Sequence, residues 1–427
     1  MDTLRRLGQR ARGDVPTAAW LILLAVFVTE YWWWHSRVKL WDGDALYYVA
    51  AALKFAGHST DDSLRLTGAF FHQESTVGRI RGTLTGVAGQ PGVGEFNLEA
   101  PRFFYSALAV PFIWVFGAKG VWVLSFLCAA AFLFVTMRLL TRLFGVQLAL
   151  GMLVLYQIAY AFWFFQTGIY TESLAALLIV LIITRLPLDR ETSRNDLICI
   201  GVLLLVLAFT RQTVPVPVAA IVFAYLWTAV RTKTWGKGNV WSGPALVAGG
   251  LGVFAVGLVS ALFPFNELRH YSEVNHLGDT AYVEAHPGQT LGKIPGLVVD
   301  MFAREFRGAF AGDHGLQVLW LLTAIAIVVR FRNVYAAMVV GSALACTLLS
   351  ILDATGRTSL RYFVPMYPMA LMLVADFWRS REWSALSVRT LPSRPDPGTA
   401  ASEQPAPQLA ARRTDAPTLP AAEPSTP

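Results

Sequence analysis

Long apolar blocks that are almost free of charge constrain this chain more than any other feature. Val121–Leu140 carries one charged residue, Arg138, and Val202–Thr210 carries none. Blocks of about 20 apolar residues are long enough to cross a bilayer as helices. Charged residues make up only 15% of the chain, whereas they make up about 25% of an average soluble protein. The sequence therefore excludes an ordinary soluble enzyme and predicts an all-α integral membrane protein.

Ten spanning helices are expected, and the basic residues between them sort to one side of the membrane. The positive-inside rule identifies that side as the cytoplasm. The expected spans are about 17–35, 119–142, 146–165, 170–187, 197–212, 213–230, 241–264, 315–330, 334–351 and 361–378. The basic residues on that side are Arg5, Arg6, Arg10 and Arg12; Arg138 and Arg142; Arg185, Arg190 and Arg194; Arg231, Lys233 and Lys237; Arg330 and Arg332; and Arg379, Arg381, Arg389 and Arg394.

Composition divides the chain into three regions. Residues 1–16 form a cytoplasmic N-terminus, and residues 17–378 form the membrane domain. The last region, 379–427, is rich in Pro, Ala, Ser and Thr, and nine of the 22 prolines lie between Leu391 and Pro427. Such a segment cannot bury a core, so we expect a disordered cytoplasmic tail.

Two long segments, about 36–118 and 265–314, are expected on the outer side. All seven histidines of the chain fall in or beside them. Either the polar chemistry gathers on the outer face, or histidine is merely costly in lipid. The first outer segment also contains an apolar run, Phe103–Phe116, of about 14 residues that Pro111 interrupts. Its length favours an interfacial or re-entrant helix; the alternative is an eleventh span, with the C-terminal tail outside.

The most informative polar stretch begins just after the first expected span. Asp42 and Asp44 lie two residues apart, and Tyr47 and Tyr48 follow in a segment with helical apolar spacing, which can lie on the membrane surface. A partly solvated carboxylate there can take a proton from a hydroxyl nucleophile or hold a metal. The alternative is a helix N-cap, because Asp before a helix accepts backbone N–H bonds. For Asp42 alone the cap is the favoured interpretation.

Further motifs follow in a fixed order. They are Asp44 with Tyr47, Tyr48, Ala51, Leu53 and Gly57; Ala100-Pro101-Arg102 before an apolar segment that ends at Phe116-Gly117; Arg138 to Arg142-Leu143-Phe144-Gly145; Tyr170-Thr171-Glu172; and Arg361-Tyr362 before Pro365. Over residues 17–378 this order resembles the GT-C superfamily of membrane glycosyltransferases. The resemblance is to bacterial members of the protein mannosyltransferase and aminoarabinose transferase type, which are glycosyltransferase family 39-like.

The chain also departs from that pattern in two places. Some relatives have a lysine that contacts the lipid phosphate where this chain has Ala100, and Arg102 is the substitute it offers. Many relatives have Asp-Glu where this chain has Asp42-Gly43-Asp44, so which aspartate acts stays open.

The resemblance implies a GT-C-type polytopic bundle with juxtamembrane helices in the first outer segment. It implies a polyprenyl-phosphate sugar as donor and Asp44 as general base in a single displacement that inverts the anomeric carbon. Asp42 and Glu172 are the other catalytic candidates. Glu172 would orient the acceptor or bind a divalent cation, Mg²⁺ or Mn²⁺, beside Asp44; the need for a metal stays open, and no other cofactor is expected. The alternative for Glu172 is a favourable position at a helix N-terminus.

Three arginines compete to bind the phosphate of the donor. Arg102 enters the interfacial segment, Arg211 ends an uncharged stretch, and Arg361 begins the last span. A guanidinium stays charged and grips phosphate with two bonds, but arginine at a helix end is often only a snorkelling anchor. The predicted substrate contacts are Tyr47, Tyr48, Tyr105, His270 and Tyr362; for His270 the alternative is a solvated surface residue.

These expectations place a glycosyltransferase in a bacterial inner membrane, with its site facing the periplasm or exterior. The expected partners are the lipid donor, membrane lipid and a protein, lipid or polysaccharide acceptor, and nucleic acid is not expected. The leading alternative is a transporter or flippase of lipid-linked sugars. A transporter places ionisable residues in the middle of its helices and often has inverted repeats, and neither is evident here. A lipid-linked polymerase or ligase is a third possibility, and the donor sugar stays open.

Overall fold

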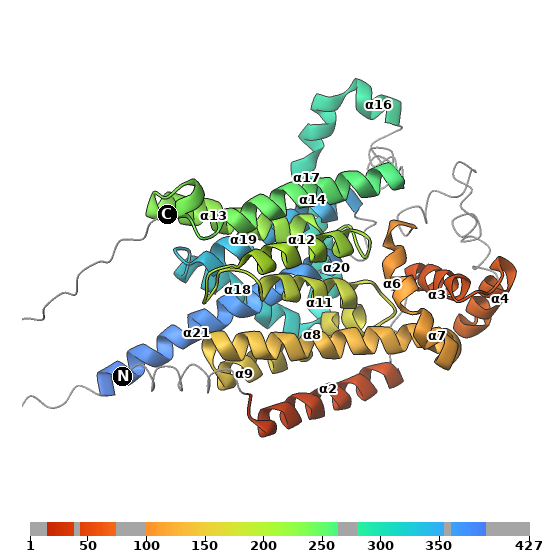
Figure 1. The fold of residues 1–427 in the computed structure, drawn as a ribbon, viewed down its shortest axis with the longest axis horizontal. Coiled ribbons are helices and arrows are strands. Elements are labelled where there is room, and N and C mark those ends of the chain that lie inside the picture. Colours follow the sequence, from red (N-terminus) through yellow and green to blue (C-terminus); the bar gives the residue numbers. More distant parts are fainter. Residues whose placement is uncertain (1–14, 38–42, 74–99, 264–279, 354–359, 390–427) are drawn as a thin grey trace, which may run out of the picture. The chain divides into compact units, whose positions relative to one another are not determined.

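The computed structural model describes residues 15–37, 43–73, 100–263, 280–353 and 360–389. The predicted residues Asp42 and His270, and the tail beyond residue 389, lie outside these ranges. The chain divides into two compact units, Met1–Glu382 and Trp383–Pro427. Every regular element in the described residues is a helix (Figure 1), so the predicted all-α class is confirmed for them.

Several helices are long and apolar enough to cross a membrane. By length and composition there are five in the described residues, and six if one bent pair counts as a span. The five are Thr17–Arg37 (α2), Val110–Phe144 (α7 with α8), Pro215–Thr232 (α13), Ser242–Leu262 (α14) and Val334–Ile351 (within α19). They indicate an integral membrane protein, as the apolar blocks predicted.

The remaining expected spans are helical but short or interrupted. The bent pair joins α9 (Val146–Gln157) to Tyr160–Thr167 at 78°. Three further helices have 12 to 16 residues: α11 (Glu172–Ile183), α12 (Arg194–Ala208) and α18 (His314–Val329). The last expected span contains α20 (Leu360–Phe363), η8 (Val364–Met366) and the start of α21 (Tyr367–Arg389). Helix therefore occupies all ten expected segments, while the count of ten spans stays a prediction.

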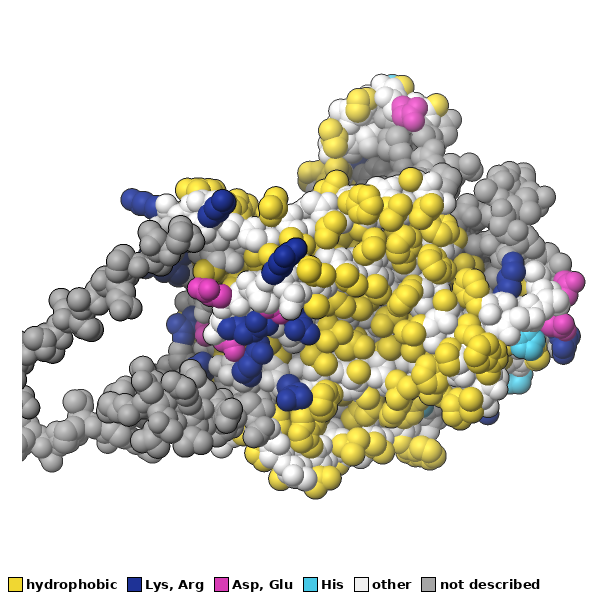
Figure 2. Space-filling model, in the orientation of Figure 1, with side chains coloured by type: hydrophobic (Ala, Val, Ile, Leu, Met, Phe, Trp, Pro, Cys, Tyr) yellow, Lys and Arg dark blue, Asp and Glu magenta, His cyan; other side chains and the backbone are white. Residues whose placement is uncertain are grey.

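Apolar side chains cover most of the surface of the first unit that Figure 2 shows. Large side chains are exposed along the spanning helices, for example Leu246 and Val253 on α14 and Val230 on α13. In water such a surface would be costly, whereas lipid tails solvate it.

Four short helices gather at one end of the helices (Figure 1): α3 (Gly43–Phe55), α4 (Thr60–Phe71), α6 (Phe103–Leu108) and α7 (Val110–Phe116). Residues Ala45–Leu53 of α3 are all buried, so protein encloses this helix. Its expected position at the membrane surface stays a prediction.

The apolar run Phe103–Phe116 forms α6 and α7 rather than one helix, and α7 packs against the start of α8. A Cβ on Gly120 would lie 2.4 Å from the backbone of Phe112, so only glycine permits this approach.

Close packing of α13 against α19 also depends on a glycine, Gly341. A Cβ there would lie 2.6 Å from the carbonyl oxygen of Ala219 and 2.8 Å from the Phe223 side chain. Small residues let membrane helices approach this closely, because van der Waals packing drives their association. We expect Gly341→Ala to lower the free energy of unfolding by about 1–3 kcal/mol through overpacking.

The matched control is Gly249→Ala within α14, where a Cβ would meet nothing within 4 Å. That substitution gains helix propensity without a clash, so the free energy of unfolding should not fall. Thermal unfolding in detergent measures both variants. Equal shifts of the two melting temperatures would contradict the packing argument.

Candidate active site

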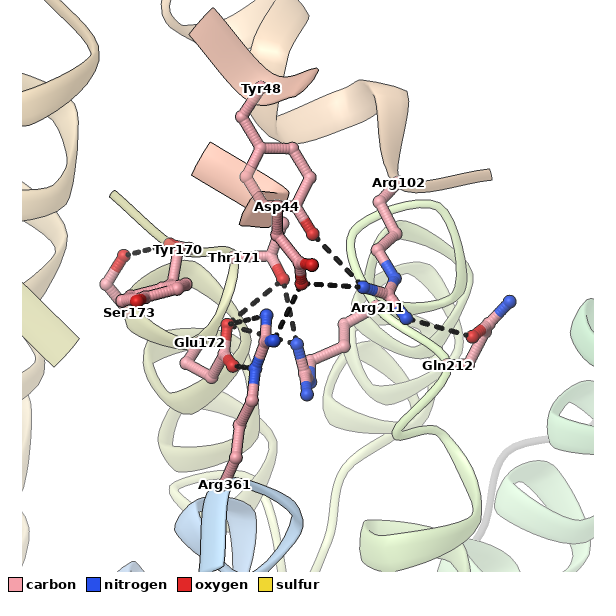
Figure 3. Close-up of polar contacts among 10 residues, drawn as sticks. All are labelled: Asp44, Tyr48, Arg102, Tyr170, Thr171, Glu172, Ser173, Arg211, Gln212 and Arg361. Atoms are coloured by element: carbon pink, nitrogen blue, oxygen red, sulfur yellow. Dashed lines mark hydrogen bonds and ion pairs between the residues drawn. The ribbon is translucent and has the colours of Figure 1, made fainter. Parts of the chain in front are cut away.

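Five of the predicted residues meet at the end of the first unit where the short helices lie (Figure 3). They come from segments far apart in the sequence, and all five are charged. Asp44 is in the first turn of α3, Arg102 ends η3 (Ala100–Arg102), and Glu172 begins α11. Arg211 lies in the turn between α12 and α13, and Arg361 lies in α20. We call these five residues the arginine–carboxylate cluster.

Asp44 contacts two of the arginines. Its Oδ2 lies 2.6 Å from Nη1 of Arg361 and 3.6 Å from Nη1 of Arg102. Its side chain keeps 23% of its exposure, while those of Arg361 and Arg102 keep 6% and 4%. Asp44 is therefore the carboxylate on the accessible side of the cluster.

Glu172 is completely enclosed and has both carboxylate oxygens engaged. Arg361 donates to Oε1 through Nε, and its Nη2 donates to Oε2 at 3.4 Å. Nη1 of Arg211 lies 3.0 Å from Oε2, and the Thr171 hydroxyl donates to the same oxygen at 3.3 Å. Glu172 therefore holds Arg211 and Arg361 in place, and it is poorly placed to accept a proton from a substrate.

Arg102 is oriented by two neutral partners. Its Nη1 donates to the Tyr48 hydroxyl at 3.1 Å, and its Nη2 donates to Oε1 of Gln212 at 3.4 Å. The guanidinium is planar, so two contacts on its terminal nitrogens set its plane. Tyr48, which the sequence predicted to bind substrate, therefore binds an arginine of the cluster through its hydroxyl group.

The other predicted tyrosines lie at different distances from the charges. The Tyr362 ring centroid lies 5.3 Å from Cζ of Arg211, within cation–π range. Tyr47 packs edge-on against Tyr48. Tyr105 is fully buried, and its hydroxyl lies 2.6 Å from the Ser125 hydroxyl. Tyr105 packs against Tyr48, with ring centroids 5.5 Å apart, and its role as a substrate contact stays a prediction.

Sequence reasoning missed three residues that complete the cluster. Gln212 and Thr171 bind arginines directly, and the Tyr170 ring centroid lies 5.1 Å from Cζ of Arg361. Each is next to a predicted residue in the sequence. The polar or aromatic neighbours of Arg211 and Glu172 were the available signal, but the sequence does not show which of them point inward.

Local backbone structure brings Arg102 and Arg211 to the same place. After α12 the chain turns, and the Arg211 N–H donates to the Leu207 carbonyl at 2.7 Å. Pro215 then begins α13, where its fixed φ and missing N–H suit a helix start. The Phe104 N–H donates to the Phe209 carbonyl at 3.2 Å. This hydrogen bond ties the segment after Arg102 to the turn that carries Arg211.

A second backbone feature positions Glu172. The chain between α9 and α11 bends and forms α10 (Tyr160–Phe162) and the π-helix η5 (Trp163–Thr167). Asp313 stabilises the bend, because its carboxylate accepts from the Ala161 N–H at 2.8 Å and caps α18 through the Leu316 N–H at 3.0 Å. Irregular backbone at membrane depth is tolerated when protein groups satisfy it. The bend ends where Glu172 begins α11.

The cluster sets the charge state of Asp44. Burial raises the pKa of its carboxyl group, but the positive charges of Arg361 and then Arg102 outweigh burial and hold the pKa below its ordinary value. Asp44 is therefore an anion at neutral pH. Three guanidinium groups against two carboxylates leave the cluster with one positive charge, so it can receive one further anion.

The sequence also predicted a divalent cation beside Asp44. No group of three or more His, Cys, Asp or Glu side chains gathers within the part of the chain that the structure describes. Asp44 and Glu172 are both paired with arginines, so a divalent cation would have to displace these pairs. A role for Mg²⁺ or Mn²⁺ stays a prediction.

Comparison of the chain with known protein families, with curated proteins and with solved structures finds no match.

Proposed function

We propose that this protein is a GT-C-type membrane glycosyltransferase that moves a sugar from a polyprenyl-phosphate donor to an acceptor hydroxyl. One observation carries the proposal. Three buried arginines from distant segments surround a carboxylate that stays partly exposed. Arginines bind phosphate strongly, and an ionised carboxylate beside them can accept a proton.

The proposed reaction is a single displacement at the anomeric carbon. The acceptor oxygen forms a bond to that carbon, while the bond from the carbon to the phosphate oxygen breaks. The electron pair of the broken bond leaves with the polyprenyl phosphate, and the proton of the acceptor hydroxyl goes to Asp44. Arg102, Arg211 and Arg361 stabilise the charge that develops on the phosphate. Preorganised cations of this kind are effective because they need no reorganisation during the reaction.

Glu172 is proposed to be a positioning residue. Its buried carboxylate fixes Arg211 and Arg361, which in turn face the accessible carboxylate of Asp44. This differs from the roles in acceptor orientation or metal binding expected from the sequence. Tyr48 and Gln212 position Arg102 in the same way.

The proposal includes a topology and a location. Ten spans, with the bent pair and the shorter apolar helices counted, would place the cluster at the outer face of a bacterial inner membrane. The basic residues between the spans support this orientation, because the positive-inside rule assigns them to the cytoplasm.

A transporter of lipid-linked sugars is the second candidate, and the 78° break after α9 favours it. Broken helices often line the substrate sites of transporters. Gln157 lies at this break and is fully buried, and its side-chain amide has no hydrogen-bond partner among the described residues. A transporter would move the lipid-linked sugar across the membrane and leave its glycosidic bond intact.

A reconstituted assay separates the two functions. Purified protein in liposomes would receive radiolabelled polyprenyl-phosphate sugars, or the same sugars as nucleotide donors, with a membrane extract as acceptor. We expect label to move to an acceptor from a lipid donor only, with release of polyprenyl phosphate. The control variant Asp61→Asn, which removes an exposed carboxylate from α4, should transfer at the rate of the wild type. Movement of intact lipid-linked sugar across the liposome without transfer would favour the transporter, and transfer from nucleotide sugars alone would contradict the donor class.

A further inference from the structure

We propose that Asp44 occupies the phosphate-binding position of the arginine–carboxylate cluster when no donor is bound, and that the phosphate of the donor replaces its carboxylate there. Binding of the donor would then release the carboxylate that acts as the base. This inference rests on the proposed function and adds its regulation: the base becomes available only when the donor is bound.

The order of exposure supports replacement of Asp44 rather than of Glu172. The Asp44 side chain keeps 23% of its exposure, whereas Arg102, Arg211 and Arg361 keep 4%, 1% and 6%. Glu172 keeps none. A phosphate that approaches the arginines from the accessible side therefore meets the Asp44 carboxylate first, and must take its place to reach them.

The contacts of the two carboxylates also favour replacement of Asp44, because Glu172 is held by more neighbours. Glu172 binds Arg361 through both oxygens and also binds Arg211 and Thr171. Asp44 contacts Arg361 and Arg102 through Oδ2, at 2.6 Å and 3.6 Å. Displacing Asp44 leaves Arg361 paired with Glu172 and leaves Arg102 hydrogen-bonded to Tyr48 and Gln212, while the incoming phosphate takes over the charge of Asp44. Displacing Glu172 would bury an unpaired charge, which is far more costly.

The charge balance matches one phosphodiester. Without Asp44 the three guanidinium groups face Glu172 alone and carry two excess positive charges, so the single negative charge of a phosphodiester restores the charge that Asp44 supplied. Arg361 and Arg102 both contact the same oxygen of Asp44, so the two guanidinium groups already converge on one anion position. A phosphate placed there would accept charge-assisted hydrogen bonds from both.

Release changes what Asp44 can do. While Asp44 is paired with Arg361, its carboxylate accepts a hydrogen bond from the guanidinium group. This pairing stabilises the charged form, so the carboxylate is a weak base. Once the phosphate has taken the arginines, the carboxylate lies beside the donor and is available to the acceptor hydroxyl. Deprotonation of the acceptor therefore waits for the donor, which gives an ordered reaction with the donor first.

The test measures binding without any sugar or transfer. A radiolabelled polyprenyl monophosphate would be titrated into full-length protein in nanodiscs. Because asparagine keeps a hydrogen-bond acceptor but loses the negative charge that competes with the phosphate for Arg361, Asp44→Asn should bind it about tenfold more tightly than the wild type. The control Asp61→Asn should bind as the wild type does.

A double-mutant cycle separates competition from a general effect of charge. Competition for Arg361 predicts that Asp44→Asn tightens binding by less than about threefold when Arg361→Gln is already present. Equal tightening with and without Arg361 would overturn the inference, as would unchanged binding by Asp44→Asn; both would leave the donor class intact. If the wild type does not bind the lipid phosphate at all, the donor class and the inference both fail.

Infrared difference spectroscopy keeps the inference testable if Arg361→Gln does not fold. Adding the lipid phosphate to the wild type should shift a carboxylate stretching band, and this band should be absent from the difference spectrum of Asp44→Asn. Saturating binding without a change in that band would show that Asp44 keeps its arginine, and would overturn the inference.

Discussion

Asp44→Asn is expected to lower the rate of sugar transfer by about 10²- to 10⁴-fold, the range over which a general base contributes. Asparagine has nearly the shape of aspartate, and its carbonyl oxygen still accepts a hydrogen bond from Arg361. It cannot take a proton from the acceptor hydroxyl. Arg361 remains paired with Glu172, so the variant should stay folded. The measurement is the initial rate of transfer in the liposome assay, with a thermal unfolding curve on the same preparation.

The exposed carboxylate of Asp61 supplies the control, since Asp61→Asn removes the same charge outside the cluster. A folded Asp44→Asn protein that transfers sugar at the rate of the wild type would exclude Asp44 as the base. Asp42, which lies outside the described residues, would then be the next carboxylate to test. Glu172 would follow only if its enclosure is relieved during the reaction.

Glu172→Ala is expected to be the most destabilising single change in the cluster. It removes the carboxylate that pairs with Arg211 and Arg361, and it leaves Arg211 buried with 1% side-chain exposure. Breaking a buried ion pair by removing one partner costs about 3–5 kcal/mol, because the remaining charge is uncompensated. That is a large fraction of the stability of a typical domain. We expect a marked fall in folded yield and in the melting temperature measured in detergent.

Two comparisons test the cause of this loss. Glu191→Ala removes an exposed carboxylate on the connection between α11 and α12, and should change the melting temperature little. Adding Arg211→Gln to Glu172→Gln should cost much less than Arg211→Gln costs alone, because the two substitutions remove a coupled pair. A Glu172→Ala protein that is as stable as the wild type but inactive would contradict the positioning role and assign Glu172 to the chemistry.

Helix positions were largely predictable from the sequence. Apolar blocks in a membrane protein must satisfy their own backbone hydrogen bonds, and helices do so within one segment. Each of the ten expected segments accordingly contains helix. The lengths of α11 and α12 were less predictable, because hydropathy does not report where a helix stops inside an apolar block. Thr184 and Thr210 lie at or just beyond the ends of these helices, where their hydroxyl groups donate to the Leu181 and Val206 carbonyls. The number of spans therefore stays a prediction.

The sequence also did not predict that protein would enclose α3. Its apolar residues at helical spacing fit a surface helix equally well, and its burial depends on the packing of α4, α6 and α7 around it. The same limit applies to Tyr105. An isolated tyrosine gives no sign of whether its hydroxyl faces a substrate or, as here, the Ser125 hydroxyl.

The sequence by itself determined which side chains carry charge and where along the chain they lie, because charged residues are costly within apolar spans and are therefore confined to their ends. Asp44, Glu172 and the three arginines could be singled out in this way. Only the tertiary structure decided how they pair. Arg361 and Glu172 are 189 residues apart, and Arg102 and Gln212 are 110 apart, so their contacts depend on how the helices pack. That packing encloses Glu172 and leaves the Asp44 side chain partly exposed, a difference between the two carboxylates that depends on the tertiary structure.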